Sequence, residues 1–333
     1  MQDKIIKFGI VGCGMIANVH ADAIAEIPNA TLYGACDHDK NRTIEFAKEF
    51  SIKAFDSYEQ MLNCENIDAV IICTPSLFHA EMAIKALNAK KHVVIEKPMS
   101  LDEKSANKII KACEKSGKKL TVISQLRLEE DVIKVKNLVK ENAFGKISLC
   151  RLAMKYVRTT EYYKSSNWRG TLKYDGGGAL MNQGIHGIDM LTYIMGDIKS
   201  VKGKIRTLVH DIEVEDTAVA VVEFSNGALG TIEASTCAYP GFDRRIEIHG
   251  DRGYVYLKEN VIEKLMIDGK EIEVDTKEHV STSSDPKTTG IFMHKRQLLN
   301  FINAILGKEE LINDCYDGKR AVKIIKDIYK SND

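Results

Sequence analysis

The fold is decided by the stretch Phe8-Gly9-Ile10-Val11-Gly12-Cys13-Gly14-Met15-Ile16-Ala17. An apolar run that begins at Ile5 ends at Val11, and a glycine-rich turn follows at once. A strand that passes through such a turn into a helix is the arrangement in which open parallel sheets bind dinucleotides. The turn therefore predicts a cofactor-binding loop, although glycines also mark ordinary turns.

Each residue type in this turn suits a dinucleotide. Gly12 permits the tight turn, Gly14 lets backbone amides approach a pyrophosphate, and Ala17 allows the helix to pack closely on the strand. The helix begins at Met15 and Ile16, where free N–H groups and a partial positive charge favour phosphate. We therefore expect these five residues to bind the cofactor.

An acid follows at the spacing that a dinucleotide site requires. Asp37 ends the next predicted strand, 20 residues beyond Ala17, where such an acid accepts hydrogen bonds from ribose hydroxyls. A carboxylate repels a ribose 2′-phosphate, so the expected cofactor is NAD. The neighbouring His38, Lys40 and Arg42 keep NADP open as an alternative.

A second charged element ends the apolar run His92-Val93-Val94-Ile95, which continues as Glu96-Lys97-Pro98. Proline stops the strand, so the charged pair falls at the carboxyl edge of the sheet, where ligands bind in this fold. We therefore predict that Glu96 and Lys97 lie in the cofactor site, with the lysine beside the reactive end of the cofactor. The alternative is that Lys97 has no function, because a single lysine that follows a strand is commonly just exposed to solvent.

The third predicted strand, residues 68–73, leads to the same edge of the sheet. Thr74 and Pro75 follow it directly, and His79 comes four residues after Pro75. These residues either line the nicotinamide ribose or cap the next helix. We include all three among the candidate cofactor-binding residues.

Two different patterns divide the chain. Through residue 125, apolar runs alternate with amphipathic helices, which predicts a doubly wound Rossmann domain with a parallel sheet covered on both faces. After about Gly145, consecutive strand-like runs predict an α+β domain with a large, mostly antiparallel open sheet. The expected fold class is therefore α/β with two domains, residues 1–125 and 126–333.

Helices and one loop complete the second half. A long helix is expected at about 178–195, and helices at about 292–306 and 318–329 finish the chain, where they can pack back on the first domain. The polar residues 275–290 are expected to form a loop. The strand-like runs of this half are 147–157, 201–208, 217–224, 228–237, 244–249 and 254–257.

The composition excludes several classes of protein. Lys plus Arg and Asp plus Glu number 47 each, so the formal net charge of zero gives no global field toward nucleic acid or an anionic membrane. No apolar stretch approaches the ~20 residues that span a bilayer, and the first apolar run is too short for a signal peptide. The eight cysteines have no metal-ligand spacing, so we expect reduced thiols, no bound metal and a cytoplasmic location.

A second set of candidate residues lies in Gly176-Gly177-Gly178-Ala179-Leu180-Met181-Asn182-Gln183-Gly184-Ile185-His186-Gly187-Ile188-Asp189. On a helix, Asn182, His186 and Asp189 share one face. Histidine suits the removal of a hydroxyl proton near neutral pH, and a lysine ammonium stabilises the negative charge that develops on the oxygen. We therefore assign His186 as general base or acid and Lys97 as its electrostatic partner. The alternative is a buried histidine satisfied by Asp189.

The segments Gly12–Ala17, Glu96–Pro98 and Gly176–Asp189 together resemble the Gfo/Idh/MocA family of sugar and cyclitol oxidoreductases. The resemblance covers nearly the whole chain. It implies an N-terminal Rossmann domain, a C-terminal α/β domain whose open sheet forms homodimers or homotetramers, and catalytic roles for Lys97 and His186. Many members have an aspartate at the position of Asn182. Asparagine exchanges no proton, which leaves hydrogen bonding to the substrate as its role.

A narrower resemblance rests on Arg158-Thr159-Thr160-Glu161-Tyr162-Tyr163, Trp168-Arg169-Gly170, Met181-Asn182-Gln183 and Ile212-Glu213-Val214-Glu215-Asp216-Thr217. This set looks like the bacterial UDP-2-acetamido-2-deoxyglucuronate (UDP-GlcNAcA) 3-dehydrogenases, whereas Gln125-Leu126-Arg127 departs from their Gln-Asn-Arg. Arginines suit a carboxylate or diphosphate, and aromatic rings suit a sugar or uracil face. The alternative is a hydrophobic loop with solvated charges. The candidate substrate-binding residues are Arg158, Tyr163, Trp168, Arg169, Asn182 and His186.

Three functions follow as hypotheses. The leading one is an NAD-dependent dehydrogenase that transfers hydride between a secondary hydroxyl of a sugar, the C3 hydroxyl of a UDP-linked N-acetyl-hexuronate, and the nicotinamide. The first alternative keeps this chemistry and acts on a free sugar or an inositol. The second is a dinucleotide-binding sensor without catalysis, which the presence of both Lys97 and His186 argues against.

Overall fold

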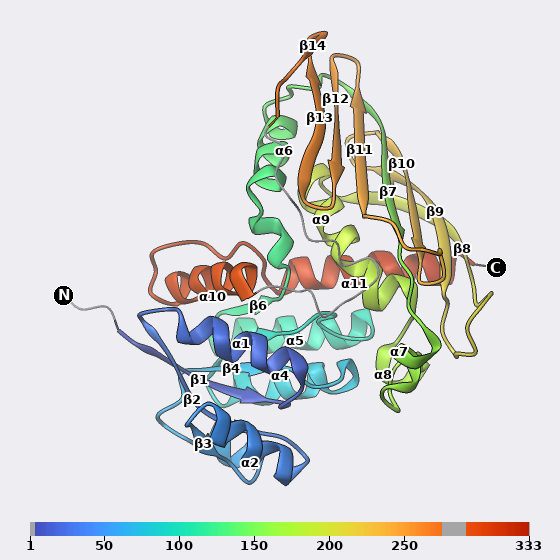
Figure 1. Cartoon of the computed structure of the whole chain (residues 1–333). Helices are drawn as coiled ribbons and strands as arrows, with labels where there is room; N and C mark the ends of the chain where they lie inside the picture. Colours follow the sequence, from blue (N-terminus) through green and yellow to red (C-terminus); the bar gives the residue numbers. More distant parts are fainter. Residues whose placement is uncertain (1–3, 275–290, 333) are drawn as a thin grey trace. The chain divides into compact units, whose positions relative to one another are not determined.

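A computed structural model describes residues 4–274 and 291–332 of the chain (Figure 1). The described residues separate into two compact units. Residues 4–125 and 291–319 form the first unit, and residues 126–274 and 320–332 form the second. The loop expected at 275–290 lies outside the described residues.

The first unit is built on a parallel sheet. Its described strands are β1 (Ile6–Val11), β2 (Ala30–Cys36), β3 (Lys53–Ala54), β4 (Ala69–Ile72), β5 (His92–Ile95) and β6 (Leu120–Val122). They follow the order β3-β2-β1-β4-β5-β6, and every neighbouring pair is parallel. The order reverses between β1 and β4, and doubly wound sheets bind their ligands at such a reversal.

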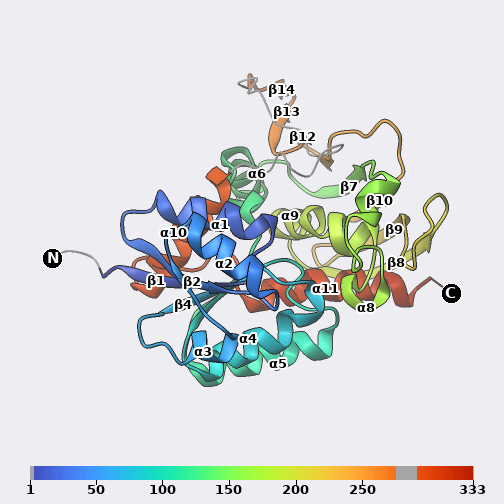
Figure 2. The ribbon, with the colours of Figure 1, turned by 60° about the horizontal axis from the view of Figure 1, so that its bottom comes forward.

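Helices cover both faces of this sheet (Figure 2). They are α1 (Met15–Ala25), α2 (Lys40–Glu49), α3 (Tyr58–Leu62), α4 (His79–Asn88), α5 (Glu103–Ser116) and α10 (Ile291–Ile305). Helices α1, α2 and α10 pack on one face, and α3, α4 and α5 pack on the other. The predicted doubly wound domain is confirmed, and it is completed by α10 from far along the chain.

Local sequence signals explain where several of these helices begin and end. The side chains of Asp39, Ser57 and Asp102 accept hydrogen bonds from backbone N–H groups in the first turns of α2, α3 and α5. Helix α5 therefore starts at Glu103. It ends at Gly117, whose φ of +67° favours glycine.

The second unit is built on an eight-stranded sheet within the described residues. Its strands are β7 (Ile147–Lys155), β8 (Ile198–Arg206), β9 (Thr217–Phe224), β10 (Leu229–Ser235), β11 (Arg245–Gly250), β12 (Gly253–Lys258), β13 (Val261–Ile267) and β14 (Lys270–Glu271). They follow the order β14-β13-β12-β11-β7-β10-β9-β8, and every pair is antiparallel except β7 with β10. This confirms the mostly antiparallel sheet. The sequence patterns did not indicate β13 and β14.

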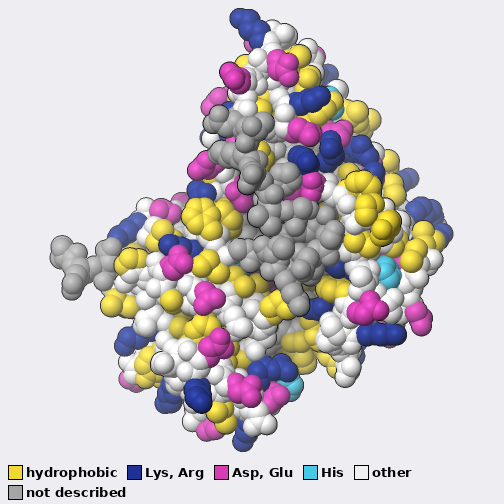
Figure 3. Space-filling view, viewed as in Figure 1, with side chains coloured by type: hydrophobic (Ala, Val, Ile, Leu, Met, Phe, Trp, Pro, Cys, Tyr) yellow, Lys and Arg dark blue, Asp and Glu magenta, His cyan; other side chains and the backbone are white. Residues whose placement is uncertain are grey.

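Helices α6 (Glu130–Lys140), α9 (Ile185–Met195) and α11 (Cys315–Lys330) pack on one face of this sheet (Figure 1). Two short helices, α7 (Thr160–Lys164) and α8 (Leu172–Asp175), precede a π-helix at Ala179–Gly184. Acidic and basic side chains are interspersed over the surface in Figure 3, as a net charge of zero allows. Within the described residues, no helix combines the length and apolarity needed to cross a membrane.

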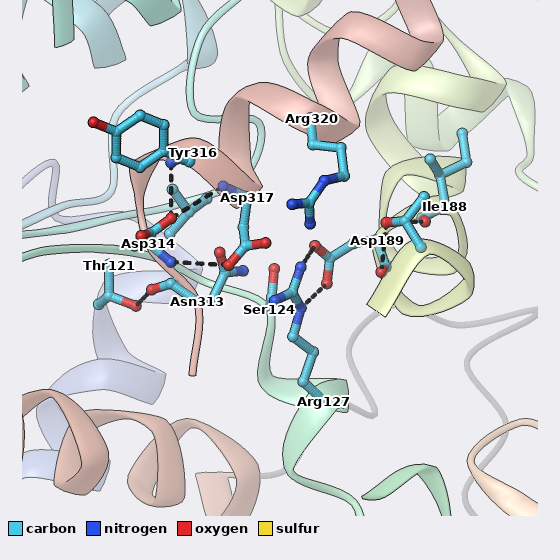
Figure 4. A network of polar contacts seen from close by, with 12 residues as sticks. Thr121, Ser124, Arg127, Ile188, Asp189, Asn313, Asp314, Tyr316, Asp317 and Arg320 are labelled. Atoms are coloured by element: carbon cyan, nitrogen blue, oxygen red, sulfur yellow. Dashed lines mark hydrogen bonds and ion pairs between the residues drawn. The ribbon is translucent and has the colours of Figure 1, made fainter. Parts of the chain in front are cut away.

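A buried ion pair joins two parts of the second unit (Figure 4). Arg127 lies just before α6, and Asp189 lies on α9. Nε and Nη2 of Arg127 donate to the two carboxylate oxygens of Asp189 at 2.8 and 2.6 Å. The two side chains are only 2% and 8% exposed. The guanidinium carbon also lies 4.8 Å from the centroid of the Tyr193 ring.

We expect the change Asp189→Asn to lower the free energy of unfolding by about 3–5 kcal/mol, because it removes the carboxylate that Nε and Nη2 of the buried Arg127 both contact. Urea unfolding followed by circular dichroism measures this loss. The control is Glu59→Gln, since the Lys85–Glu59 pair in the first unit has side chains 44% and 63% exposed. That change should cost less than about 1 kcal/mol. Equal losses in both variants would contradict a special role for the buried pair.

Candidate active site

The glycine turn after β1 is shaped by the backbone of the neighbouring strand. Gly12 has a φ of +90°, and a Cβ atom there would lie 2.8 Å from the carbonyl carbon and oxygen of Cys73. Conformation and space both exclude a side chain at this position. At Gly14, a Cβ atom would meet no described atom within 4 Å. The turn is therefore open there, and a ligand can approach the backbone.

The N-terminus of α1 differs from those of α2, α3 and α5. Gly14 is its N-cap, so no side chain caps the first turn, and that turn contains no acid. Helices α2, α3 and α5 are all capped by an acid or a hydroxyl. The N–H groups at Met15 and Ile16 stand at the uncapped positive end of a helix dipole, and Ala17 is buried against the sheet. These residues fit the pyrophosphate of NAD.

Asp37 lies at the end of β2 and ties it to the glycine turn. Its Oδ2 accepts a hydrogen bond from the Cys13 N–H at 2.8 Å, and its Oδ1 accepts one from the Asp39 N–H at 3.0 Å. Nδ1 of His38 lies 2.7 Å from Oδ1, and Nη1 of Arg42 lies 3.8 Å from Oδ2. A carboxylate beside the turn fits the ribose hydroxyls of NAD.

Thr74 and Pro75 follow β4, and His79 begins α4. The His79 ring is buried, with Nδ1 2.7 Å from the Pro98 carbonyl oxygen and Nε2 2.8 Å from that of Thr74. Burial lowers the pKa of His79, and these two hydrogen bonds act in the opposite direction. The ring therefore joins the chain segments that follow β4 and β5, and it supports the edge of the sheet from inside.

Glu96 and Lys97 follow β5 directly at this edge. Oε1 of the buried Glu96 lies 2.8 Å from Nε2 of His20. Burial acts to raise the pKa of Glu96, but the hydrogen bond from His20 and the charges of His20, His294 and Lys97 lower it to about 2. No sequence pattern pointed to His20 or His294 as site residues. Lys97 is partly exposed, so the edge presents an ammonium group next to a buried carboxylate.

The second unit places its candidate residues on the π-helix and α9. From residue 179 to residue 192, every side chain is buried except those of Asn182, Gln183 and His186. This helical segment is thus buried except at one place, and the side chains exposed there are all polar. The single α-helix expected at about 178–195 is in fact a π-helix followed by α9. Such π-helical turns are frequent at functional sites.

The glycines before the π-helix are required by close packing. A Cβ atom at Gly177 would lie 2.1 Å from the Tyr329 hydroxyl, and one at Gly178 would lie 1.9 Å from the Glu215 carbonyl oxygen. The Glu215 carboxylate accepts hydrogen bonds from the N–H groups of Gly178 and Leu180 and from the Tyr329 hydroxyl at 2.8 to 2.9 Å. The glycine run therefore anchors the helix.

A chain of hydrogen bonds fixes the amide of Asn182. Its Nδ2 donates to Oδ1 of Asp175 at 3.2 Å, and its Oδ1 accepts from Nε2 of Gln183 at 2.9 Å. Oε1 of Gln183 accepts in turn from Nη2 of Arg158 at 2.8 Å. Asp175 and Gln183 were not predicted as site residues. The signal that marks Asp175 is its place directly before the glycine run.

The arginines of segment 158–169 lie on aromatic faces. The guanidinium carbon of Arg169 lies 4.3 Å from the ring centroid of Tyr162 and 5.2 Å from that of Trp168. The guanidinium carbon of Arg158 lies 5.7 Å from the Tyr162 ring. Tyr163 instead donates a hydrogen bond to Oγ1 of Thr236 at 2.9 Å. The structure thus gathers Arg158, Trp168 and Arg169 around Tyr162.

The two units define the class of the protein. The first has the turn, the uncapped helix and the acid of a dinucleotide-binding domain, and the second presents an imidazole suited to proton exchange. This is the organisation of an NAD-dependent oxidoreductase. The chain belongs to the Gfo/Idh/MocA family: residues 6–124 match the oxidoreductase family model with an NAD-binding Rossmann fold, and residues 132–256 match the GFO/IDH/MocA C-terminal domain. Both the resemblance and the NAD cofactor are confirmed.

Individual relatives act on different sugars and polyols. Myo-inositol 2-dehydrogenase of Thermotoga maritima is 31% identical over 79% of this chain and 78% of its own length. Glucose-6-phosphate 3-dehydrogenase of Bacillus subtilis is 27% identical over 98% of this chain and 96% of its own. The WlbA dehydrogenase of Bordetella pertussis, solved with NADH and UDP-GlcNAcA, has a TM-score of 0.89 and is 31% identical, covering 100% of this chain and 96% of that one.

We expect Asp37→Ala to raise the KM for NAD about 10–100-fold, because hydrogen bonds from ribose hydroxyls to a charged group contribute about 1.5–3 kcal/mol. The ratio of NAD to NADP efficiency should fall with it, since the repulsive carboxylate is gone. Steady-state kinetics with both cofactors measures this ratio. The matched control is Asp39→Ala, whose side chain caps α2. An unchanged ratio in the Asp37 variant would disprove the assignment.

Proposed function

We propose that this chain is an NAD-dependent dehydrogenase of a nucleotide sugar, and that it oxidises the C3 hydroxyl of a UDP-linked N-acetyl-hexuronate. The observation that carries the proposal is the pair Arg158 and Arg169 on the Tyr162 ring. Arg158 is buried and is also linked through Gln183 to Asn182. Guanidinium groups bind carboxylates and phosphates with two parallel hydrogen bonds. This cluster therefore suits an anionic sugar substrate.

Similarity over the whole chain to WlbA supports this choice of substrate. That protein was solved with NADH and UDP-GlcNAcA, and it covers all of this chain at 31% identity. A second WlbA dehydrogenase, solved with the same two ligands, is 30% identical over all of this chain. UDP-GlcNAcA carries both a carboxylate and a diphosphate, the groups that the arginine cluster suits.

The proposed chemistry divides the work between three side chains. Bound NAD accepts the hydride from the carbon that carries the hydroxyl. We assign the hydroxyl proton to His186, because an imidazole exchanges protons near neutral pH. Lys97 donates a hydrogen bond to the hydroxyl oxygen and stabilises the negative charge that develops on it. Asn182 hydrogen-bonds the substrate, and Asp175 orients its amide.

One observation favours a second substrate class. The myo-inositol dehydrogenase of Thermotoga maritima is as similar in sequence, at 31% identity, as the Bordetella pertussis WlbA dehydrogenase. An inositol has no anionic group for the arginine cluster to bind. We therefore place inositols and free sugars second. A dinucleotide-binding sensor without catalysis comes third, because His186 and Lys97 would then have no task.

The experiment that tests the proposal is incubation with NAD and a panel of UDP-uronates, UDP-sugars, inositols and free hexoses. NADH absorbance is followed, and α-ketoglutarate is added in a parallel set to re-oxidise tightly bound NADH. We expect turnover of UDP-GlcNAcA and much less of UDP-GlcNAc, which lacks the carboxylate. Turnover of inositols or hexoses alone would refute the substrate. NADH binding without turnover of any compound would favour the sensor.

We expect His186→Ala to lower kcat by about 10²–10⁴-fold, as the loss of a general base does, and Lys97→Met to lower it by about 10²–10³-fold. In the His186 variant, NADH affinity, measured by fluorescence titration, should change less than about threefold, because the imidazole acts on the substrate proton. The matched control is His249→Gln, a histidine on β11 beside Tyr254 and Tyr256. Wild-type turnover in the His186 variant would contradict its role.

We also propose that the protein forms a homodimer or homotetramer through the outer face of the second unit's sheet. Four apolar side chains there are half exposed or more: Leu149 (50%), Val219 (51%), Val221 (58%) and Leu229 (59%). They lie on the adjacent strands β7, β10 and β9 and point to the same face. Figure 3 shows hydrophobic side chains over these strands. A second copy of the chain would cover this patch with the same patch of its own.

Sedimentation velocity tests this assembly. We expect the wild type to sediment as a dimer or tetramer, and Val221→Lys to shift it toward monomer by weakening association more than about 100-fold, since a buried lysine at the centre of an apolar interface is strongly unfavourable. The control is Ile44→Lys, because Ile44 is an exposed apolar residue on α2 of the first unit. A monomeric wild type at micromolar concentration would exclude the assembly.

A further inference from the structure

The carboxylate of Glu96 is engaged at both of its oxygens. Oε1 lies 2.8 Å from Nε2 of His20, and Oε2 accepts a hydrogen bond from the backbone N–H of Lys97 at 3.2 Å. The Glu96 carboxylate is therefore hydrogen-bonded to the backbone amide of Lys97 itself. A shift of this carboxylate would also shift the backbone from which the Lys97 side chain extends.

Two buried histidines from separate helices surround this carboxylate. His20 lies on α1 and His294 on α10, and neither is more than 1% exposed. Their rings meet edge to face with centroids 5.2 Å apart. One nitrogen of each ring and one oxygen of Glu96 all lie within 4.8 Å of one another. Because α1 and α10 share one hydrophobic core, the packing of the unit holds both rings in place.

The charge of Glu96 is stabilised by these neighbours. Burial alone would raise the pKa of a carboxyl group. The hydrogen bond from His20, together with the charges of His20, His294 and Lys97, outweighs burial and brings the pKa to about 2. Glu96 is therefore a carboxylate at any pH at which the protein works.

Two other titratable groups, Cys73 and His79, face Glu96, and burial disfavours the charged form of each. Burial, with a smaller effect of Glu96, raises the pKa of the Cys73 thiol. Burial lowers the pKa of His79, although its contacts with the Pro98 and Thr74 carbonyls oppose this.

The three side chains also resemble a metal-ligand set, but their distances favour hydrogen bonding. Ligands about 2.0–2.2 Å from a zinc ion stand about 3.3 Å from one another, whereas His20 Nε2 and Glu96 Oε1 are 2.8 Å apart. A metal-bound histidine normally donates its second ring N–H to an acceptor. Among the residues that the structure describes, Nδ1 of His20 is buried and has no hydrogen-bond partner.

We propose that His20 and His294 are positioning residues that act on Lys97 through Glu96. They keep the carboxylate charged and in one place, and the carboxylate fixes the Lys97 backbone and favours the ammonium form. Lys97 is thereby held ready to donate a hydrogen bond to the hydroxyl oxygen. The inference rests on the proposed role of Lys97 in the reaction.

The first test is His20→Leu, with His20→Gln as the conservative variant that keeps an N–H donor for Glu96. We expect H20L to lower kcat about 10–100-fold, as the loss of a supporting hydrogen bond does, and to change the KM for NAD less than about threefold. The basic limb of its kcat–pH profile should move to lower pH, because the ammonium loses its proton more readily once the carboxylate is displaced. H20Q should recover most of the turnover and the wild-type profile.

Two further variants separate positioning from general damage. His92→Gln alters another partly buried histidine, on β5, whose Nδ1 accepts from the Lys119 N–H, and it should leave kcat unchanged. In the double variant H20L/K97M, turnover should be no lower than in K97M alone, because the effect of His20 passes through Lys97. A further loss as large as that of H20L in the wild type would overturn the inference.

A second measurement needs no substrate. Only an unprotonated amine reacts with acetic anhydride, and Lys97 is exposed enough to react. We expect the labelling rate of Lys97, followed by peptide mass spectrometry, to rise at lower pH in Glu96→Gln and H20L than in the wild type. Identical labelling curves would refute the inference. So would one equivalent of zinc in the purified wild type that is lost in H20Q.

The outcomes distinguish this inference from the function on which it rests. If K97M keeps wild-type turnover, the proposed role of Lys97 fails, and the inference fails with it. If K97M loses turnover while H20L keeps the kcat, pH profile and labelling curve of the wild type, only the positioning role is wrong. Circular dichroism and NADH titration of each variant show that it is folded.

Discussion

The close approach of the β1–α1 turn to the end of β4 is the constraint on which the cofactor edge depends. Gly12 leaves no room for a side chain beside the Cys73 backbone and has a positive φ, so β1, its turn and β4 have one possible arrangement. The ends of β2 and β5 lie on either side and bring Asp37 and Glu96 to the same edge. Parallel strands make this convergence unavoidable, because all their carboxyl ends point one way.

This edge is also the part that the sequence predicts best. Gly12, Asp37 and Lys97 each follow an apolar run, so a run of buried residues and the turn after it are enough to place them. The antiparallel sheet of the second unit was equally predictable, since alternation and turn residues are local signals. The first and last residues of the helices were less predictable, because capping residues such as Asp102 decide where a helix starts.

Contacts between distant segments could not be predicted in this way. His20 meets Glu96, and His294 joins them from α10, although nothing in their spacing relates the three positions. Asp175 reaches Asn182 because a π-helix replaces the expected α-helical turn, and no pattern of apolar residues signals that change. These contacts depend on tertiary packing, which single-sequence patterns do not carry. They also include the polar groups most closely joined to the proposed catalytic residues.

The return of the chain to the first unit bears on how such proteins acquire new specificities. Leu298, Phe301 and Ile302 of α10 fill the core beside α1, so a gene fragment that ended at residue 125 would encode a sheet with part of one face uncovered. The second unit is in effect an insertion, residues 126–274, with a separate terminal piece at 320–332. Recombination would have to exchange both pieces at once. Gradual substitution within the insertion is therefore the easier evolutionary route to a different sugar.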